Sequence, residues 1–361
     1  MNKKTVVVGM SGGVDSSVAA YLLKEEGYHV IGVTMQIWQE EESYVEQENG
    51  GCCGLSAVDD ARRVAEILDI PYYVMNFKQE FKRDVMDYFA EEYFAGRTPN
   101  PCIACNRFVK WEALLKRSIE IGADYIATGH YARVQQLENG RYSICNSVTA
   151  AKDQTYALYN LTQEQLARTR MPVGDYTKDE IRQIAEKIHV RIANKPDSQD
   201  ICFVPNGDYA GFIQEYTNRT VPTGNFVNQA GVVLGKHKGI IHYTVGQRKG
   251  LGISLGQRTF VTEIRPKTNE VVLGDRMAAS AITIRAKQIN FMAISDIPAD
   301  GMRVFAKIRY NHKGAWCHVK RTGEDELTGV FEEPQHAITP GQALVMYEEE
   351  RLLGGGVICG P

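Results

Sequence analysis

A short loop near the N-terminus has the residue types and spacing that bind phosphate. Thr5–Met10 is a β-branched, apolar run, which is typical of a buried parallel strand. It leads into Ser11-Gly12-Gly13, where glycine permits close backbone approaches that a Cβ atom would forbid. Asp15 and Ser16 then open an amphipathic helix. A strand, a glycine loop and a helix N-terminus in this order present free N–H groups and a positive dipole end to an anion, most simply a phosphate.

The loop differs from two familiar nucleotide-binding patterns. It contains neither the Gly-Lys-Ser/Thr of a Walker loop nor the Gly-x-Gly-x-x-Gly of a dinucleotide site. The structural alternative is a tight turn with a helix cap. A cap needs only one Ser or Asp, whereas positions 11–17 read Ser-Gly-Gly-Val-Asp-Ser-Ser. The pattern therefore favours a phosphate site.

A second group of reactive residues consists of Cys102, Cys105 and Cys202. The first two have Cys-x-x-Cys spacing directly after a Pro-Asn-Pro bend, and the third lies in Asp197–Phe203. Such thiols occur in zinc sites, redox pairs and iron–sulfur sites. Structural zinc would require a fourth soft ligand, and there is no second Cys-x-x-Cys. A pair of inert buried thiols is the remaining alternative.

The other cysteines are expected to be chemically quiet. Cys145, Cys317 and Cys359 stand singly in strand-like runs and are expected to be small buried hydrophobes. Cys52 and Cys53 lie in a Gly-rich segment and receive no role. The chain has 8 cysteines, no signal-peptide pattern and no apolar run near the ~20 residues of a membrane span. We therefore expect a cytoplasmic protein that has no membrane partner.

Alternating elements predict an α/β domain that positions both groups. Four strand-like runs alternate with four helical patterns, which indicates a parallel sheet with helices on both faces. Ligands of such sheets bind at the carboxyl ends of the strands, so Ser11, Met35 and 128–130 are expected to converge on one crevice. A further helix is expected over 175–188. The predicted strands are Thr5–Met10, His29–Met35, Pro71–Asn76 and Asp124–Thr128, and the predicted helices are Asp15–Glu26, Val58–Leu68, Phe81–Phe94 and Val109–Ile121.

The composition changes after about Asn206, where Gly, Thr and Val become more frequent and helical periodicity fades. Beyond Ala281, short alternating runs such as 281–286, 302–309 and 316–321 indicate a small antiparallel barrel. We predict a catalytic domain over 1–205, a small central domain over 206–278 and a β-barrel over 279–361.

Charge is distributed unevenly along the chain. The formal net charge is −3, yet residues 1–100 have a balance of −8 and residues 231–320 a balance of +10. Lys and Arg supply most protein contacts to phosphate, so the basic stretch is typical of a nucleic-acid footprint. A solvated basic face without a partner is the alternative.

An ordered set of motifs resembles a known family. Ser11–Ser16 look like the pyrophosphate (PP) loop of the ATP-pyrophosphatase superfamily. Over nearly the whole chain the motifs resemble those of the tRNA-specific 2-thiouridylases, which thiolate the wobble uridine of Lys, Glu and Gln tRNAs. The resemblance implies an adenine-nucleotide α-hydrolase-like (PP-loop) domain, a central tRNA-binding domain and a C-terminal β-barrel. The matching segments are 11–17, 97–101, 105–107, 127–133, 151–156, 197–203 and 243–252.

The resemblance also implies roles for individual residues. ATP activates the C2 oxygen of uracil with Mg²⁺ present, Cys202 bears a persulfide, and Cys105 frees the sulfur or closes a disulfide with Cys202. A sulfur-relay protein or a cysteine desulfurase supplies the sulfur. The implied ATP contacts are Gly9, Met10, Ser11, Gly12, Gly13, Val14, Asp15, Ser16, Met35 and Gly129, and the implied tRNA contacts are Asn100, His130, Lys152, Asp153, Gln154, Arg309, Tyr310 and Gln342.

One departure from the family leaves the sulfur chemistry open. Many members have Asp where this chain has Cys102, and a thiol is a poor replacement for that carboxylate. With this substitution Cys102, Cys105 and Cys202 could instead ligate a [4Fe–4S] cluster whose fourth iron accepts sulfide. The persulfide and the cluster are both kept as hypotheses.

Three rival functions remain for the whole chain. A PP-loop amidotransferase or ligase would explain the loop but would leave the thiols and the basic stretch without a role. Another tRNA thiolase, acting on cytidine or a different uridine atom, would use the same parts. A non-catalytic RNA-binding protein with a vestigial ATP fold would bind tRNA without turnover.

Overall fold

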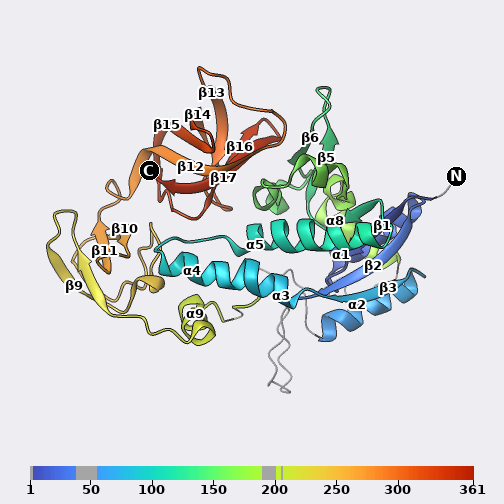
Figure 1. Ribbon diagram of the computed structural model, residues 1–361, viewed down its shortest axis with the longest axis horizontal. Coiled ribbons are helices and arrows are strands. Elements are labelled where there is room, and N and C mark those ends of the chain that lie inside the picture. The colour runs from blue at the N-terminus through green and yellow to red at the C-terminus, as the bar shows by residue number, and fades with distance from the viewer. Residues whose placement is uncertain (1–2, 38–54, 189–200, 205) are drawn as a thin grey trace. The chain divides into compact units, whose positions relative to one another are not determined.

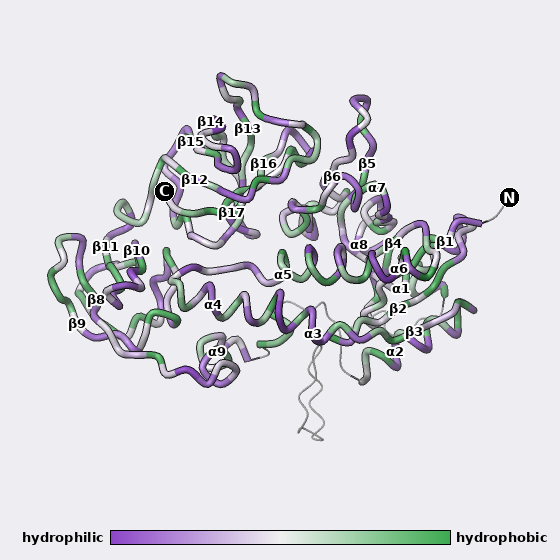
Figure 2. Tube along the Cα trace, in the orientation of Figure 1, coloured by the Kyte–Doolittle hydropathy of each residue, from purple (hydrophilic) through white to green (hydrophobic). Residues whose placement is uncertain are grey.

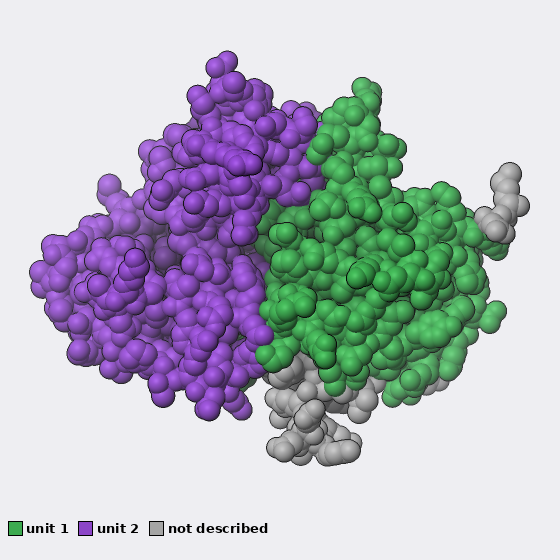
Figure 3. Space-filling model, in the orientation of Figure 1, with its two compact units in different colours: residues 1–85, 102–207, 350–352 green, residues 86–101, 208–349, 353–361 purple. Residues whose placement is uncertain are grey.

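The computed structural model describes residues 3–37, 55–188, 201–204 and 206–361. The chain divides into two compact units, coloured separately in Figure 3. Unit 1 contains residues 1–85, 102–207 and 350–352, and unit 2 contains residues 86–101, 208–349 and 353–361. Cys52 and Cys53 lie outside the described residues.

Unit 1 is built on a parallel sheet, as predicted (Figure 1). Its order is β3-β2-β1-β4-β7, and every neighbouring pair is parallel. The chain runs outward from β1 to β3 and then returns to β4 on the other side of β1, so the order reverses between β1 and β4. Ligands of such sheets bind at this reversal. The strands are β1 Thr5–Gly9, β2 His29–Gln36, β3 Tyr72–Asn76, β4 Tyr125–Ala127 and β7 Thr169–Arg170.

Helices cover both faces of this sheet because β1 is apolar on both sides. Val6 and Val8 join one core cluster with residues of α1 (Val14–Glu25) and α8 (Lys178–Lys187). Val7 is also fully buried and lies on the opposite face by strand alternation. Near that side, the helix that begins at Pro101 places Leu114 beside Gly9. The predicted helices of this unit are confirmed in type.

Three helical stretches follow β2 and β3 in the chain. The first is α2, Leu55–Ile67. The second combines α3 Lys78–Phe81, a π-helical segment Lys82–Asp87 and α4 Tyr88–Phe94. The third combines α5 Pro101–Ala104, a π-helical segment Cys105–Leu114 and α6 Leu115–Glu120.

The start predicted for this third helix, at Val109, is wrong. The helix begins at Pro101, because proline has the backbone angle of a first helical turn and lacks only an N–H group that is unpaired there in any case. Cys102 and Cys105, which follow the predicted Pro-Asn-Pro bend, therefore both lie in this helix.

Unit 1 also contains a hairpin that the sequence patterns did not predict. A hairpin joins β5 (Ala132–Gln136) to β6 (Tyr142–Asn146). Short helices follow at η3 Ala150–Lys152, η4 Thr155–Leu158, α7 Gln163–Ala167 and η5 Pro172–Asp175.

Unit 2 contains a small sheet and a barrel. The sheet has the order β10-β11-β8-β9 and is preceded by α9 (Tyr209–Thr217), a helix that fading periodicity did not predict. The η6 turn, Ile240–His242, follows β9. The sheet strands are β8 Gly224–Val227, β9 Val233–His237, β10 Phe260–Arg265 and β11 Glu270–Gly274.

The predicted C-terminal barrel is confirmed. Its order is β12-β15-β14-β13-β16-β17, and β12 pairs with β17 to close it. Buried and exposed residues alternate, as from Cys317 to Lys320, and hydropathy alternates with them (Figure 2). The strands are β12 Ser280–Phe291, β13 Met302–Lys307, β14 Ala315–Gly323, β15 Glu326–His336, β16 Ala343–Glu348 and β17 Arg351–Gly360.

Alternation also decides the environment of the isolated cysteines. Cys145 and Cys317 are buried, as expected. The expectation that Cys359 is buried is wrong, and its thiol is exposed. Side chains alternate along β17, so Cys359 points away from the buried side that Ile358 occupies. No helix in the described ranges is long and apolar enough to cross a membrane.

Candidate functional site

The loop between β1 and α1 has a backbone that only glycine can supply. Gly12 has a φ of +67°, and a Cβ atom there would lie 2.4 Å from the carbonyl oxygen of Ala57 in α2. Gly13 is the N-cap of α1 and provides no side chain to pair with the first N–H groups of the helix. A Cβ at Gly13 would meet only Ser11 Oγ within 4 Å, so this side of the loop is open. The helix N-terminus is therefore presented as an anion site requires.

Serine hydroxyls hold this loop in shape. The backbone N–H of Ser11 donates to Ser16 Oγ at 3.2 Å, and that hydroxyl lies 3.2 Å from the carbonyl oxygen of Gly13. Ser17 Oγ donates to the same carbonyl at 2.8 Å. The two hydroxyls consequently fix the first turn of α1 against the loop before any ligand binds.

Asp15 is held by two donors that come from distant parts of the chain. Tyr131 Oη donates to Asp15 Oδ1 at 2.8 Å. Lys178 Nζ donates to Oδ1 and Oδ2 at 2.8 and 3.0 Å, and the side chains of Lys178 and Asp15 are only 12% and 27% exposed. This places a lysine at the loop even though no lysine lies in the loop sequence.

Lys178 is a site residue that the sequence analysis missed. It follows Thr177, whose hydroxyl forms a capping box with Glu180, so Lys178 occupies the first position of α8. A cation at a helix N-terminus opposes the helix dipole, and this unfavourable placement is the local signal that could have pointed to a function.

The ends of the neighbouring strands meet the loop closely. A Cβ atom on Gly129 would lie 2.6 Å from the backbone nitrogen of Ser16, so the segment after β4 packs directly on the start of α1. On the other side, Thr34 Oγ1 of β2 donates to the carbonyl of Met10 at 2.7 Å. Met35 follows Thr34 in β2 and pairs with Met75 of β3. The segments that carry Ser11, Met35 and Gly129 thus converge as expected.

His130 links this strand end to the cysteine-bearing helix. Its Nδ1 lies 2.6 Å from Thr128 Oγ1 and its Nε2 lies 3.3 Å from Lys110 Nζ. Burial, and then the positive charge of Lys110, lower the pKa of His130 well below its ordinary value. A neutral ring accepts from Lys110 at Nε2, so Nδ1 carries the proton and donates to Thr128. Lys110 also donates to Asn106 Oδ1 at 2.9 Å, and Asn106 lies next to Cys105.

The depressed pKa of His130 predicts how stability depends on pH. At a pH between the folded-state pKa of His130 and the ordinary value of 6.5, the unfolded chain binds a proton at this residue that the folded chain does not. The contribution of neutral His130 to the free energy of unfolding is therefore complete above pH ~6.5 and is lost as the pH falls below that value. We expect His130→Gln to flatten the fall in urea midpoint between pH 7.5 and 5.5. An equally steep fall in the variant would assign the acid sensitivity to other groups.

The three thiols of the candidate site lie in unit 1. Cys102 and Cys105 are exposed and half-buried respectively, and their i, i+3 spacing in the helix puts them on one face. Cys202 is exposed in a short segment anchored by its neighbour Phe203, whose ring packs on Phe81 at 5.7 Å. Within the described ranges no three His, Cys, Asp or Glu side chains are grouped to hold a metal ion.

Three of the unit 1 residues predicted to contact tRNA lie in one turn, and one of them, Gln154, supports Tyr131. Asp153 accepts the N–H of Ser147 at 3.2 Å and the hydroxyl of Thr155 at 2.6 Å. Gln154 Oε1 accepts the N–H of Tyr131 at 2.9 Å, and Tyr131 in turn binds Asp15. Lys152 is half-buried in the same turn. Their contact with tRNA stays a prediction, and the structure gives Asp153 and Gln154 a positioning role.

The other predicted tRNA contacts belong to unit 2. Gln342 Nε2 donates to the carbonyl of Thr98 at 2.8 Å and so fixes the segment that carries half-buried Asn100. Arg309 Nη1 donates to the carbonyl of His336 at 3.0 Å, and Tyr310 beside it is 43% exposed.

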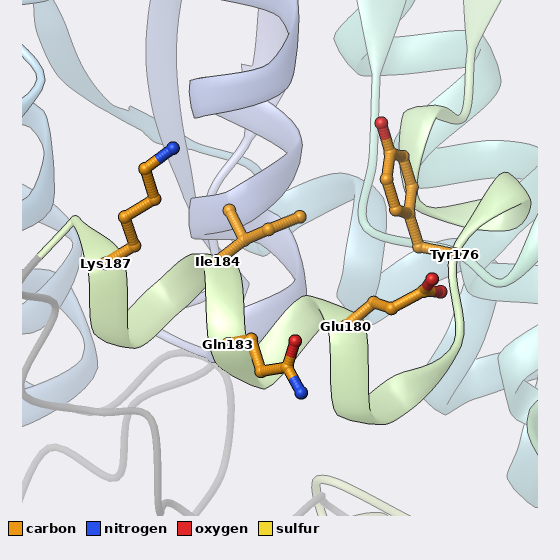
Figure 4. Close-up of a pocket in the computed structure, with 5 residues that line it drawn as sticks. All are labelled: Tyr176, Glu180, Gln183, Ile184 and Lys187. Atoms are coloured by element: carbon orange, nitrogen blue, oxygen red, sulfur yellow. The ribbon is translucent and has the colours of Figure 1, made fainter.

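A separate hollow of about 270 Å³ lies on α8 and the residue before its cap (Figure 4). It includes none of the predicted site residues, and three of its side chains lie on the solvent-exposed part of the helix. We assign it no role. Its lining consists of Tyr176, Glu180, Gln183, Ile184 and Lys187.

Comparisons with known proteins cover nearly the whole chain. Family models match three consecutive segments: a tRNA methyl transferase HUP domain over 4–206, a tRNA methyl transferase PRC-barrel domain over 210–275 and an aminomethyltransferase beta-barrel domain over 282–358. A tRNA-specific 2-thiouridylase MnmA of Lachnoclostridium phytofermentans is 66% identical over 98% of this chain and 99% of its own length. Proteins of the same name from Clostridium perfringens and Clostridioides difficile are 55% and 54% identical over 99% of this chain and 99% and 98% of their own lengths.

One solved structure shows a weak resemblance to the chain. A 4-thiouridine synthetase in complex with RNA and ATP covers 60% of this chain and 50% of its own, at 17% identity and a TM-score of 0.34. This likeness is too weak to inform the site.

Proposed function

This chain belongs to the tRNA-specific 2-thiouridylase family, and from that premise we propose that it uses ATP to replace the C2 oxygen of a tRNA uridine with sulfur. The observation that carries the proposal is the 66% sequence identity to a relative over 98% of this chain. The predicted phosphate loop and the three thiols, which lie in one unit, support it. We further propose the wobble uridine of Lys, Glu and Gln tRNAs as substrate and the cytoplasm as location.

The first half of the reaction is activation of the uracil oxygen. The C2 oxygen is a poor leaving group, so it attacks the α phosphate of ATP and forms an adenylate while pyrophosphate leaves. The open N-terminus of α1 would bind the phosphates, and Ser16 and Ser17 keep the loop in shape. Mg²⁺ would neutralise charge on the leaving pyrophosphate.

The second half is transfer of sulfur from a cysteine persulfide. The terminal sulfur of a Cys202 persulfide attacks C2, and AMP leaves with the former C2 oxygen. The Cys105 thiolate then attacks the Cys202 sulfur, which breaks the S–S bond, leaves sulfur on C2 and forms a Cys105–Cys202 disulfide. A thiol reductant and a new persulfide, supplied by a sulfur-relay protein or a cysteine desulfurase, complete the cycle.

The persulfide route is favoured here over an iron–sulfur cluster. The persulfide route needs only Cys105 and Cys202, whereas a cluster would also require Cys102 as a third ligand. A colourless, iron-free protein that thiolates tRNA would support this choice. Activity that rises in proportion to bound iron would contradict it.

The most direct test is nucleoside mass spectrometry of tRNA after incubation with protein, ATP and a persulfide donor. We expect 2-thiouridine at the wobble position, formed only with ATP. A thiolated cytidine or a 4-thiouridine would instead identify another tRNA thiolase. Binding of tRNA without any thiolated product would identify a non-catalytic RNA-binding protein.

Lys178 provides a prediction specific to the ATP step. It neutralises Asp15 beside the predicted phosphate site, so Lys178→Met would leave an uncompensated carboxylate where a polyanion must bind. We expect the Kd for ATP to rise about 10-fold, equivalent to about 1.4 kcal/mol. Equilibrium ATP binding measures this effect.

Lys187→Met is the matched control, since Lys187 is an exposed lysine at the other end of α8. If Lys178→Met and Lys187→Met bind ATP with equal affinity, Lys178 has no role in ATP binding and serves only to hold α8 against α1.

A further inference from the structure

A hollow in unit 2 collects arginine side chains from three separate segments. Its volume is about 360 Å³, and its lining consists of Arg248, Arg258, Phe260, Asp275, Arg276 and Met277. Phe260 pairs with Gly274 where β10 begins and β11 ends, which brings Arg258 near the turn of residues 275–277. Hydrogen bonds between Gly246 and Val261, and between Val261 and Gln247, attach the segment that carries Arg248. We call this site the arginine hollow.

The arginine hollow has an excess of positive charge. Its lining contains three guanidinium groups and one carboxylate, and Asp275 uses Oδ1 to accept the N–H of Ala278 at 2.8 Å. In the described part of the chain none of the three arginines forms an ion pair, whereas Arg265, Arg303 and Arg321 of the same unit each pair with a carboxylate. Three neighbouring cations repel one another unless an anion binds between them.

The arginine hollow adjoins a segment already predicted to contact tRNA. The ring of Phe260 meets the ring of His336 at 5.1 Å, edge to face. Burial, and then the charges of Arg276 and Arg309, lower the pKa of His336, so both guanidinium groups lie near this imidazole. His336 Nδ1 is buried and has no hydrogen-bond partner among the described residues. Positive charge therefore continues from Arg309 to the hollow.

The chemistry of the lining identifies the class of ligand. A guanidinium group can donate two parallel hydrogen bonds to the oxygens of one phosphate, and this bidentate geometry favours arginine in phosphate sites. Phe260 is half-buried and Met277 is 84% exposed, so the rim also offers apolar surface to a sugar or a base. The volume lies near the lower end of the ~300–1,000 Å³ typical of small-ligand sites, which suits a single nucleotide.

We propose that the arginine hollow binds the phosphate backbone of the tRNA substrate at an anchoring point separate from the loop and the thiols of unit 1. The proposal rests on the proposed function, since tRNA is the polyanion that this protein must hold. An anchor of this kind contributes affinity without reading sequence.

The test is the salt dependence of tRNA binding by a triple variant, Arg248→Gln, Arg258→Gln and Arg276→Gln. All three side chains are exposed, so we expect the fold to persist. Each lost phosphate contact lowers the slope of log K against log salt by roughly one. We therefore expect the slope to fall by about 2 to 3 and the Kd for tRNA to rise at least ~10-fold at ~0.1 M KCl.

Two further variants make the result specific. Lys267→Gln, Lys287→Gln and Lys320→Gln together remove the same charge from other exposed positions of unit 2 and should change the slope less. Arginine-to-lysine changes at the three hollow positions should keep most of the slope, because the charge remains. Hydroxyl-radical footprinting of bound tRNA should show one protected backbone segment lost only in the glutamine variant of the hollow.

An unchanged tRNA affinity and an unchanged salt slope in the triple glutamine variant would overturn the proposal. Loss of binding to an acidic protein, with tRNA binding unchanged, would overturn it as well. The binding assay requires neither ATP nor turnover. A wild-type protein that bound tRNA through the hollow but formed no thiouridine would thus contradict the proposed function while leaving this inference intact.

Discussion

Cys202→Ser is expected to reduce 2-thiouridine formation at least ~10³-fold while leaving ATP-dependent adenylation of tRNA intact. Serine carries no persulfide, and its hydroxyl cannot take part in thiol–disulfide exchange, so the sulfur-bearing nucleophile is lost outright. The Cys202 segment is anchored by Phe203 on Phe81, a contact that serine does not disturb. Nucleoside mass spectrometry measures the product, and pyrophosphate release measures the first half-reaction.

Cys359→Ser is the matched control for this prediction, because Cys359 is also exposed but lies at the end of the barrel. It should retain full activity. Thiolation by Cys202→Ser at a rate near that of the wild type would remove Cys202 from the mechanism.

Changes at Cys102 separate the two sulfur hypotheses. A cluster needs all three thiols, whereas the persulfide route as proposed uses only Cys105 and Cys202. We expect Cys102→Asp, which restores the residue of many family members, to remain active and iron-free. Loss of activity together with bound iron would favour the cluster.

Gly12→Ala is expected to lower the rate of tRNA adenylation at least ~100-fold, equivalent to about 2.7 kcal/mol of transition-state stabilisation. An alanine at a φ of +67° costs about 1–2 kcal/mol, and its Cβ would lie 2.4 Å from the carbonyl oxygen of Ala57. The loop must move away from α2, and the N–H groups aimed at the phosphates move with it. Single-turnover pyrophosphate release measures the effect.

The adjacent glycine provides the control. Gly13 has a φ of −101°, which alanine tolerates, and a Cβ there would meet only Ser11 Oγ, at 3.3 Å. Gly13→Ala should therefore cost much less than Gly12→Ala. Equal losses in the two variants would show that close approach of the phosphates, rather than backbone strain, limits the loop.

Local patterns in the sequence were sufficient to predict the sheet, the glycine loop after its first strand and the barrel. The apolar run that includes Val6–Val8 specifies a strand that is buried on both faces, and strand alternation specifies the barrel. The family resemblance added the roles of the thiols and the tRNA contacts, and the curated relatives agree with the family. The domain boundaries and the individual residue roles stay predictions.

The tertiary structure alone decided which distant side chains meet. Lys178 and Asp15 are 163 positions apart, and only the packing of α8 on α1 brings the amine to the loop. The arginine hollow likewise depends on the β10–β11 pairing, which places Arg258 and Arg276 together. Periodicity reports which face of an element is buried, but the neighbour of that face is set by long-range packing and strand register, which no local window of sequence contains.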